Sequence, residues 1–223
     1  MYCRATGCAQ RTTGWSRYCS AHKSRLRRHG HPDQQGVSKK ALQPHLKRLH
    51  GVRRRNPDSP LWRLLIERWE ALVDGCKSRE TAYLAGQVAQ RNETEAAREI
   101  VRLSSEVRPS EVIDVVAAMI LMSRWEPSRF RSDAAVFHQT ARRVRSLSET
   151  SVGSRYDPRS GRVRRVYREL SPKTAMILGR WLVESFGGLG LWIYGIEREA
   201  ARAAQQRTVA INQAMRELQC SIP

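Results

Sequence analysis

Long apolar runs, low-complexity polar tracts and an apolar leader are all missing from this 223-residue sequence. The longest stretch without a charged residue, positions 185–196, is too short to cross a bilayer. The first 30 residues contain no apolar segment of the kind that secretion signals carry. Hydrophobic residues still make up 40% of the chain, and the absence of polar tracts argues against wholesale disorder. We therefore expect a folded cytoplasmic protein without a membrane span.

Acidic residues are scarce as well. The chain has 21 Asp and Glu against 40 Lys and Arg, which gives a formal net charge of +19. Residues 1–60 hold 14 of the basic side chains but only Asp33 and Asp58 as acids. Such a field favours a polyanionic partner, nucleic acid or an anionic membrane. Arg supplies 34 of the 40 basic residues and forks onto phosphate as Lys does not. A GC-rich genome would also explain that ratio, but not the crowding of charge in residues 1–60.

Sequence signatures of catalysis are missing too. No Ser/His/Asp grouping or Cys/His nucleophile pair stands out, and the glycines of residues 187–190 lack the preceding strand that a dinucleotide-binding loop needs. His45, His50 and Asn56 alone have spacing remotely like that of an HNH nuclease site. They lie in a proline-broken stretch without an Asp-His pair. We predict no catalytic residue, and a metal-dependent nuclease with scattered carboxylates is kept as an alternative.

Cysteine is sparse but clustered. Three of the five cysteines fall in the first 19 residues, and with one histidine they form the pattern C-x4-C-x10-C-x2-H: Cys3, Cys8, Cys19 and His22. Three thiolates and an imidazole make the closed tetrahedral shell that holds structural Zn²⁺. In a reducing cytosol, clustered cysteines indicate metal more often than disulfides. A module this small cannot bury enough apolar surface to fold alone, so the metal would supply its stability. We predict one structural zinc site.

This stretch resembles a small zinc-binding motif of phage and mobile-element proteins that often accompanies HNH endonuclease modules. The matching positions are Gly7-Cys8, Tyr18-Cys19, His22, Arg25 and residues 29–32, His-Gly-His-Pro. Arg17 stands where the motif has Gly, and Lys23 where it has an aromatic residue. The resemblance covers residues 1–32. It implies a treble-clef-like zinc finger in a protein of a phage, plasmid or other mobile element.

Basic residues continue through the finger helix, expected at 19–29, and through residues 33–59, expected to be a linker or arm with one short helix around 38–49. A basic arm of this kind tracks a nucleic-acid backbone with little sequence preference; a merely solvated, charged linker is the alternative. The basic helix lacks the aromatic face that membrane-surface helices use. The candidate nucleic-acid contacts in this part of the chain are Lys23, Arg25, Arg27, Arg28, Lys39, Lys40, Lys47, Arg48, Arg53, Arg54 and Arg55.

Residues 60–223 are expected to form a helical domain. Apolar periodicity predicts helices at about 60–75, 79–91, 93–105, 111–125, 132–147, 171–186 and 191–218, of which 111–125 is the buried central one. Glycines 187 and 188 are expected to separate the last two. The last helix either packs on the body or pairs with a second chain.

A basic β-hairpin is expected at about 152–168, turned by Asp157-Pro158 and Gly161. Helices 111–125 and 132–147 followed by this hairpin resemble a winged helix-turn-helix, in which the second helix enters the major groove and the wing grips a flank. A helical bundle with a solvated hairpin is the alternative. The candidate contacts here are Arg142, Arg145, Arg159, Arg162, Arg164 and Arg165.

The sequence therefore predicts a mainly α-helical protein with an N-terminal zinc finger that binds nucleic acid as a non-catalytic regulator or accessory factor. DNA is the favoured polymer, and RNA stays an alternative. One alternative is a subunit of a larger nucleoprotein complex, such as an RNA-guided or replication assembly. The other is the nuclease with a cryptic site.

Overall fold

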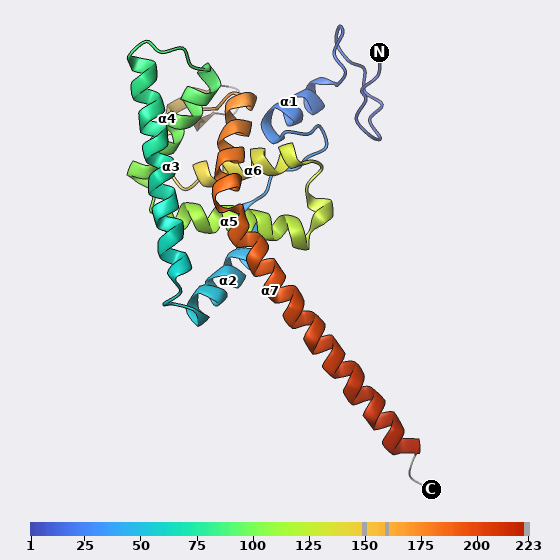
Figure 1. Ribbon diagram of the computed structural model, residues 1–223. Coiled ribbons are helices and arrows are strands. Elements are labelled where there is room, and N and C mark those ends of the chain that lie inside the picture. Colours follow the sequence, from blue (N-terminus) through green and yellow to red (C-terminus); the bar gives the residue numbers. More distant parts are fainter. Residues whose placement is uncertain (149–150, 159–160, 221–223) are drawn as a thin grey trace.

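The computed structural model describes residues 1–148, 151–158 and 161–220, which are mainly helical (Figure 1). Their elements in chain order are α1 (Ser20–His29), α2 (Lys39–Arg55), α3 (Pro60–Leu84), α4 (Arg91–Glu106), α5 (Pro109–Trp125), the 3-10 turn η1 (Pro127–Arg129), α6 (Asp133–Arg145), β1 (Ser151–Asp157), β2 (Arg162–Tyr167) and α7 (Pro172–Cys220). The mainly α-helical class predicted from the sequence is confirmed, with one small two-stranded sheet.

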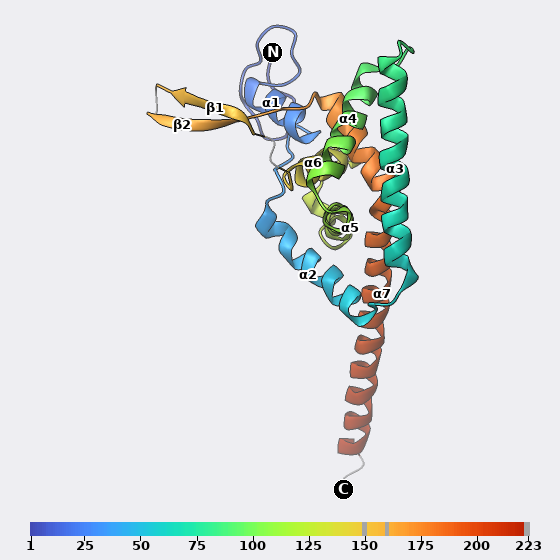
Figure 2. The ribbon, with the colours of Figure 1, turned by 90° about the vertical axis from the view of Figure 1, so that its left-hand side faces the viewer.

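Helix α5 lies at the centre of the core. Its residues from Val112 to Met122 are all buried, because a helix that is apolar on nearly every side has to be covered all round. Helices α2, α3, α6 and α7 contact it, and Figure 2 shows α5 nearly end-on among them. Trp69 of α3 and Phe186 of α7 are fully buried in the same core, with ring centroids 6.1 Å apart. The predicted buried helix is confirmed.

Helix α2 takes the place of the expected basic linker. One helix runs from Lys39 to Arg55, where the sequence predicts an arm with a short helix around 38–49. Ser38 caps it by accepting a hydrogen bond from the Ala41 amide at 3.1 Å. Pro44 removes one backbone donor inside the helix. Packing against α5 outweighs that loss, because α2 buries Leu42, His45, Leu49 and Val52. The basic stretch is therefore part of the folded body.

Helix α3 runs without a break past Gly75, where the sequence predicts its end. The buried stripe continues across this position, with Val73 on one side and Cys76 on the other. A helical glycine costs about 1 kcal/mol relative to alanine, and the continued packing on α4 outweighs that cost. The predicted stop at Gly75 is wrong for this reason.

Helix α7 likewise continues through residues 187–190, which the sequence predicts to be a turn. Gly190 within this stretch, and Gly179 earlier in the helix, serve close packing. A Cβ atom on Gly190 would overlap the carbonyl oxygen of Ala117 in α5, and one on Gly179 would overlap that of Phe137 in α6. Only residues without a side chain let the α7 backbone cross those helices at this separation. The predicted break between two helices is therefore wrong.

The second half of α7 projects away from the body, at the end opposite the N-terminal module (Figure 1). The side chains of residues 198–216 are exposed. Within the described part of the chain, no helix is both long and apolar enough to span a membrane.

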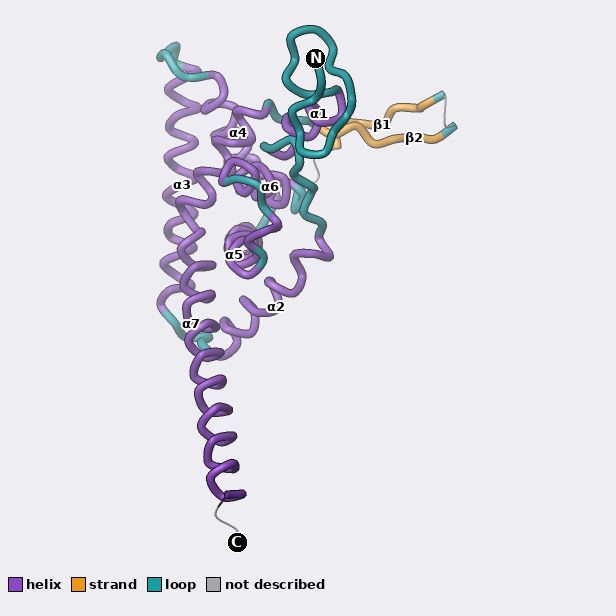
Figure 3. The backbone as a smooth tube through the Cα atoms, turned by 90° about the vertical axis from the view of Figure 1, so that its right-hand side faces the viewer, coloured by secondary structure: helices purple, strands orange, loops and turns teal. Residues whose placement is uncertain are grey.

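The hairpin lies where the sequence predicts it and projects from the helices on the same side as α1 (Figure 2 and Figure 3). Strands β1 and β2 pair antiparallel, with Arg155 opposite Arg164 and Asp157 opposite Arg162. Gly161 has a φ of +63°, the left-handed conformation that a tight turn into β2 requires.

Two glycines of α7 provide a matched test of this packing. Gly190→Ala should destabilise the protein by about 1–3 kcal/mol, because the added methyl group is forced into the α5 backbone. Gly188→Ala should stabilise it by about 0.4–1 kcal/mol, since Gly188 is exposed with open space around it. Urea unfolding of both variants measures the difference, and equal effects would show that α7 does not pack at this separation.

Candidate metal centre and the basic surface around it

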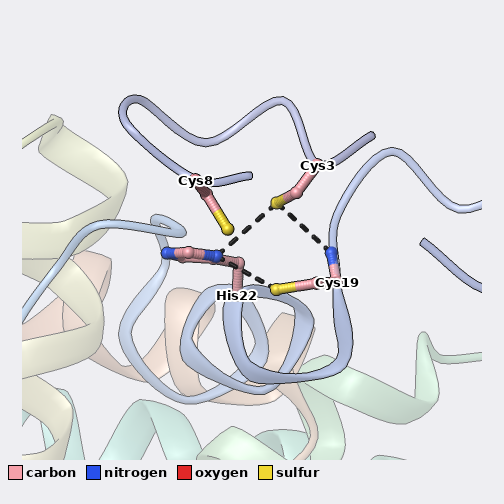
Figure 4. A group of neighbouring side chains, drawn as sticks. All are labelled: Cys3, Cys8, Cys19 and His22. Atoms are coloured by element: carbon pink, nitrogen blue, oxygen red, sulfur yellow. Dashed lines mark hydrogen bonds between the residues drawn. The ribbon is translucent and has the colours of Figure 1, made fainter. Parts of the chain in front are cut away.

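Four side chains near the N-terminus converge on one point. The ligand atoms of Cys3, Cys8, Cys19 and His22 all lie within 4.8 Å of one another, and Figure 4 shows the three sulfur atoms and the imidazole turned toward a common centre. Cys3 and Cys19 are buried, while Cys8 and His22 are half-buried. The residues that the sequence spacing singles out are therefore placed together by the fold, close enough to hold a metal ion.

The local backbone explains why these residues meet. Cys3 and Cys8 lie on a loop held by a bridge between Tyr2 and Arg11, and Gly7 turns this loop with a φ of +73°. Cys19 is the N-cap of α1, so His22 follows in the first turn and projects from the same side. Ala5 and Tyr18 pack on the cysteines in a small cluster separate from the main core.

The electrostatics of the cluster favour the thiolate at Cys3 but not at Cys8. A backbone hydrogen bond at Gln10 lowers the pKa of Cys8, but burial and the neighbouring thiols raise it overall. His22 directs its Nδ1 toward the sulfurs, 3.2 Å from Cys19 Sγ and 3.5 Å from Cys3 Sγ. The amide of Cys19 donates to Cys3 Sγ at 3.3 Å. Burial opposes ionisation of Cys3, but hydrogen bonds from the Cys19 and Ala5 amides outweigh it and lower the pKa of that thiol to about 7. Deprotonated sulfur is the form that ligates metals, so the donor set fits a metal ion.

Asp33 lies behind the histidine, a contact that the spacing of the ligands does not predict. Its Oδ1 lies 3.6 Å from His22 Nε2, the ring nitrogen on the side away from the sulfurs. A carboxylate in this place fixes the orientation and tautomer of a ligating histidine and makes the ring a better donor. The composition contains a hint of this role, because Asp33 is one of only two acidic residues in the basic stretch 1–60.

Two buried glutamines fasten the metal-binding module to the helical body. Gln139 of α6 donates from Nε2 to His29 Nδ1 at 2.9 Å and accepts from the Val37 amide at 2.9 Å. Gln34 donates to the Arg129 carbonyl at 3.2 Å and accepts from the Arg131 amide at 3.1 Å. Both side chains are nearly inaccessible, and leaving one buried partner unsatisfied costs about 1–3 kcal/mol. The module is therefore held in a fixed position on α6.

Gly30 brings the end of α1 onto α6. It ends the helix in the left-handed conformation, φ +79°, and its amide donates to the Leu26 carbonyl. A Cβ atom there would lie 2.6 Å from His138 and 2.8 Å from the Ala134 carbonyl oxygen, both on α6. The motif around Gly30, predicted as a helix stop, is thus also a docking contact.

The exposed surface of α1 is entirely basic or neutral. The helix contains no acidic residue and buries none of its residues. Its predicted contact residues all reach solvent: Lys23, Arg25, Arg27 and Arg28. The helix therefore exposes four cations, spread around its axis, next to the cluster of cysteines and His22.

The basic residues of α2 divide into two groups. Arg53 forms a bidentate ion pair with the buried Asp114 at 2.5 and 2.8 Å, and Arg48 contacts Glu197 at 3.1 Å. These two arginines hold α2 on α5 and α7, which differs from the free phosphate contacts that the sequence suggests. The other predicted residues of α2 are exposed: Lys39, Lys40, Lys47, Arg54 and Arg55.

The predicted contacts of α6 and the hairpin also differ in their settings. Arg145 is held inside the protein by Glu99 at 2.6 Å and by the Arg168 carbonyl, so its role is structural, whereas Arg142 reaches solvent. In the hairpin Arg162 is exposed, and Arg164 and Arg165 lie on β2 opposite Arg155 and Ser154. Arg159 lies outside the described residues.

The three residues with nuclease-like spacing do not come together. His45 Nε2 lies 3.0 Å from Glu126, and His50 Nε2 lies 3.1 Å from Asp114. Asn56 donates to the Val52 carbonyl at the end of α2. Each side chain thus has its own structural partner.

Comparison of the chain with protein-family models, with curated proteins and with solved structures gives no match. The metal-binding cluster and the cations around it are therefore the observations from which a function is inferred.

The carboxylate behind His22 provides a test of the metal centre. Asp33→Asn should weaken metal binding about 10–100-fold, because the neutral amide makes the imidazole a poorer donor. Competition with a chromogenic chelator measures the affinity, and Asp58→Asn is the control that removes the same charge elsewhere. Equal affinities in the two variants would show that Asp33 does not orient the ligand.

Proposed function

We propose that the protein binds nucleic acid through a zinc-stabilised N-terminal module docked on a helical body, and that it does so without catalysing a reaction. Three cysteines and one histidine are the donor set of structural Zn²⁺ sites, whose four protein ligands leave no open position for a substrate. The Cys19 amide donates a hydrogen bond to Cys3 Sγ, and the Asp33 carboxylate lies behind His22. Contacts of these two kinds surround the ligands of structural metal sites.

The observation that carries the proposal is the pair of constraints on α1. Its first turn supplies His22 to the metal cluster, and its last residue, His29, is hydrogen-bonded to Gln139 of the body. Between these two points the helix exposes only basic and neutral side chains. Because the helix is held at both ends by other contacts, its exposed cations add little to the stability of the fold. Phosphate binding would use these charges directly.

Other exposed cations lie on the same side of the molecule. The hairpin, α1 and the beginning of α2 lie on the same side of the helical body in Figure 2 and Figure 3. Lys39, Lys40 and Arg162 are exposed on these elements. A surface of this length, in a chain of net charge +19, suits a polyanion that extends over several phosphates.

We further propose DNA as the polymer, with RNA as the alternative, and a treble-clef-like finger of the mobile-element type that the motif resembles, in a regulator or accessory factor. We do not extend the proposal to a winged helix-turn-helix. Helix α6 contacts α1, α5 and α7, and Arg145 is paired with Glu99. These contacts leave little of α6 for a major groove.

A role as a subunit of a nucleoprotein complex is the second candidate, and the second half of α7 favours it. This segment extends beyond the body (Figure 1) and exposes Val209, Ile211 and Met215. Apolar side chains on an isolated helix are typical of a surface that another chain covers.

The salt dependence of binding tests the role of α1. Fluorescence anisotropy with labelled double-stranded DNA, single-stranded DNA and RNA should show binding that weakens steeply with salt. The double variant Lys23→Gln/Arg25→Gln should reduce the slope of log K against log salt by about two, since each phosphate contact contributes about one unit.

The matched control is Arg202→Gln/Arg207→Gln, which removes the same charge from the exposed part of α7. Equal loss of affinity in both double variants would show that net charge alone attracts the polymer and that α1 has no special part in binding.

A further inference from the structure

A small cavity lies where the module meets the body. It has a volume of about 50 Å³ and opens between α1 and α6, with Leu170 and Ala175 also on its wall. The volume is more than one water molecule needs. Four arginines line it, two from each helix: Arg27, Arg28, Arg142 and Arg145.

The charges around this cavity do not balance. Glu169 is the one carboxylate in its lining, and it contacts Arg28 loosely at 3.8 Å with both side chains more than half exposed. Arg145 is already neutralised by Glu99. Among the described residues, Arg27 and Arg142 have no ion-pair partner. The cavity therefore holds more positive charge than the protein neutralises.

The titration of neighbouring groups reflects this surplus. Desolvation lowers the pKa of Arg142, the charge of Arg28 lowers it further, and the charge of Glu169 opposes the decrease. Burial lowers the pKa of His29 to about 4, and the charges of Arg142 and Arg28 contribute to that decrease. Like charges crowded at a partly enclosed place repel each other, and an anion bound between them removes that repulsion.

We propose that this cavity binds a phosphate group, held by Arg28 from α1 and Arg142 from α6, with Arg27 beside them. Guanidinium groups fork onto phosphate oxygens, and two of them from different helices satisfy most of its acceptors. The inference rests on the proposed function for the source of this phosphate, a nucleic-acid backbone; free inorganic phosphate has the same chemistry and is separated by the test below.

A phosphate in this place joins the two parts of the protein. Arg28 lies on the helix that carries His22, and Arg142 lies on the helix that carries Gln139. The same anion thereby contacts the metal-binding module and the body, and its binding reinforces the hydrogen bonds of Gln139 to His29 and Val37. We therefore expect phosphate to stabilise the docked module as well as to attract the polymer.

The test compares Arg142→Gln with Arg207→Gln, which removes an equal charge from exposed α7. Thermal unfolding is followed with inorganic phosphate and with sodium chloride at equal ionic strength, and the anisotropy salt series is run on the same samples. Phosphate should raise the melting temperature of the wild type and of Arg207→Gln but not that of Arg142→Gln. The salt slope should decrease by about one in Arg142→Gln alone.

Metal content and the melting temperature without phosphate serve as controls for correct folding. Without phosphate, the melting temperature of Arg142→Gln should equal or exceed that of the wild type, because one of two repelling charges is gone. Arg28→Gln, on the exposed face of α1, serves as the second variant. In one outcome, phosphate raises the melting temperature only when Arg142 is present, and the protein binds no oligonucleotide. This result supports the cavity as a site for free phosphate and overturns the proposed function. In the other outcome, Arg142→Gln and Arg28→Gln bind oligonucleotides as the wild type does, and phosphate does not raise the melting temperature. This result overturns the phosphate site in the cavity and leaves the proposed function standing.

Discussion

The position of the metal-binding module depends on the buried amide of Gln139. Its two hydrogen bonds, to His29 at the end of α1 and to the Val37 amide before α2, join the first two helices to α6. Because the side chain is 1% exposed, neither bond is replaced easily by water. The cluster of Cys3, Cys8, Cys19 and His22 fixes the other end of α1. Helix α1 is therefore held in one orientation relative to α6 and to the beginning of α2.

The arginines divide between those that form buried ion pairs and those that are exposed, in a way that composition does not reveal. Arg53 and Arg145 are turned inward onto Asp114 and Glu99, carboxylates that would be costly to bury without a partner. Among the residues that the structure describes, the arginines of α1 have no such partner, apart from the loose contact of Arg28 with Glu169. Charge that is exposed, unpaired and fixed in place is the part of the +19 available to a polyanion.

Local features of the fold could be predicted from the sequence, and long-range ones could not. The clustering of Cys3, Cys8, Cys19 and His22 was predicted because their spacing is local, and the buried helix α5 because its apolar pattern is unmistakable. The breaks predicted at Gly75 and at residues 187–190 were wrong, since glycine serves both for turning and for close packing and the sequence does not distinguish the two uses. Helix α2 was underestimated because Pro44 was weighed without the apolar face that packs on α5. The Gln139 contacts span more than a hundred residues and carry no sequence signature.

Removal of the metal tests the central claim most directly. The oligonucleotide affinity of the wild-type protein is measured before and after extraction of the metal with a chelator, while circular dichroism follows the helical body. The small cluster around Cys3 and Cys19 is separate from the main core, so the body should keep its cooperative melting transition when the module loses its metal. We expect affinity to fall by at least an order of magnitude and to return when Zn²⁺ is added. Unchanged affinity in the metal-free protein would contradict the account, because α1 would then have no part in binding that depends on its anchoring.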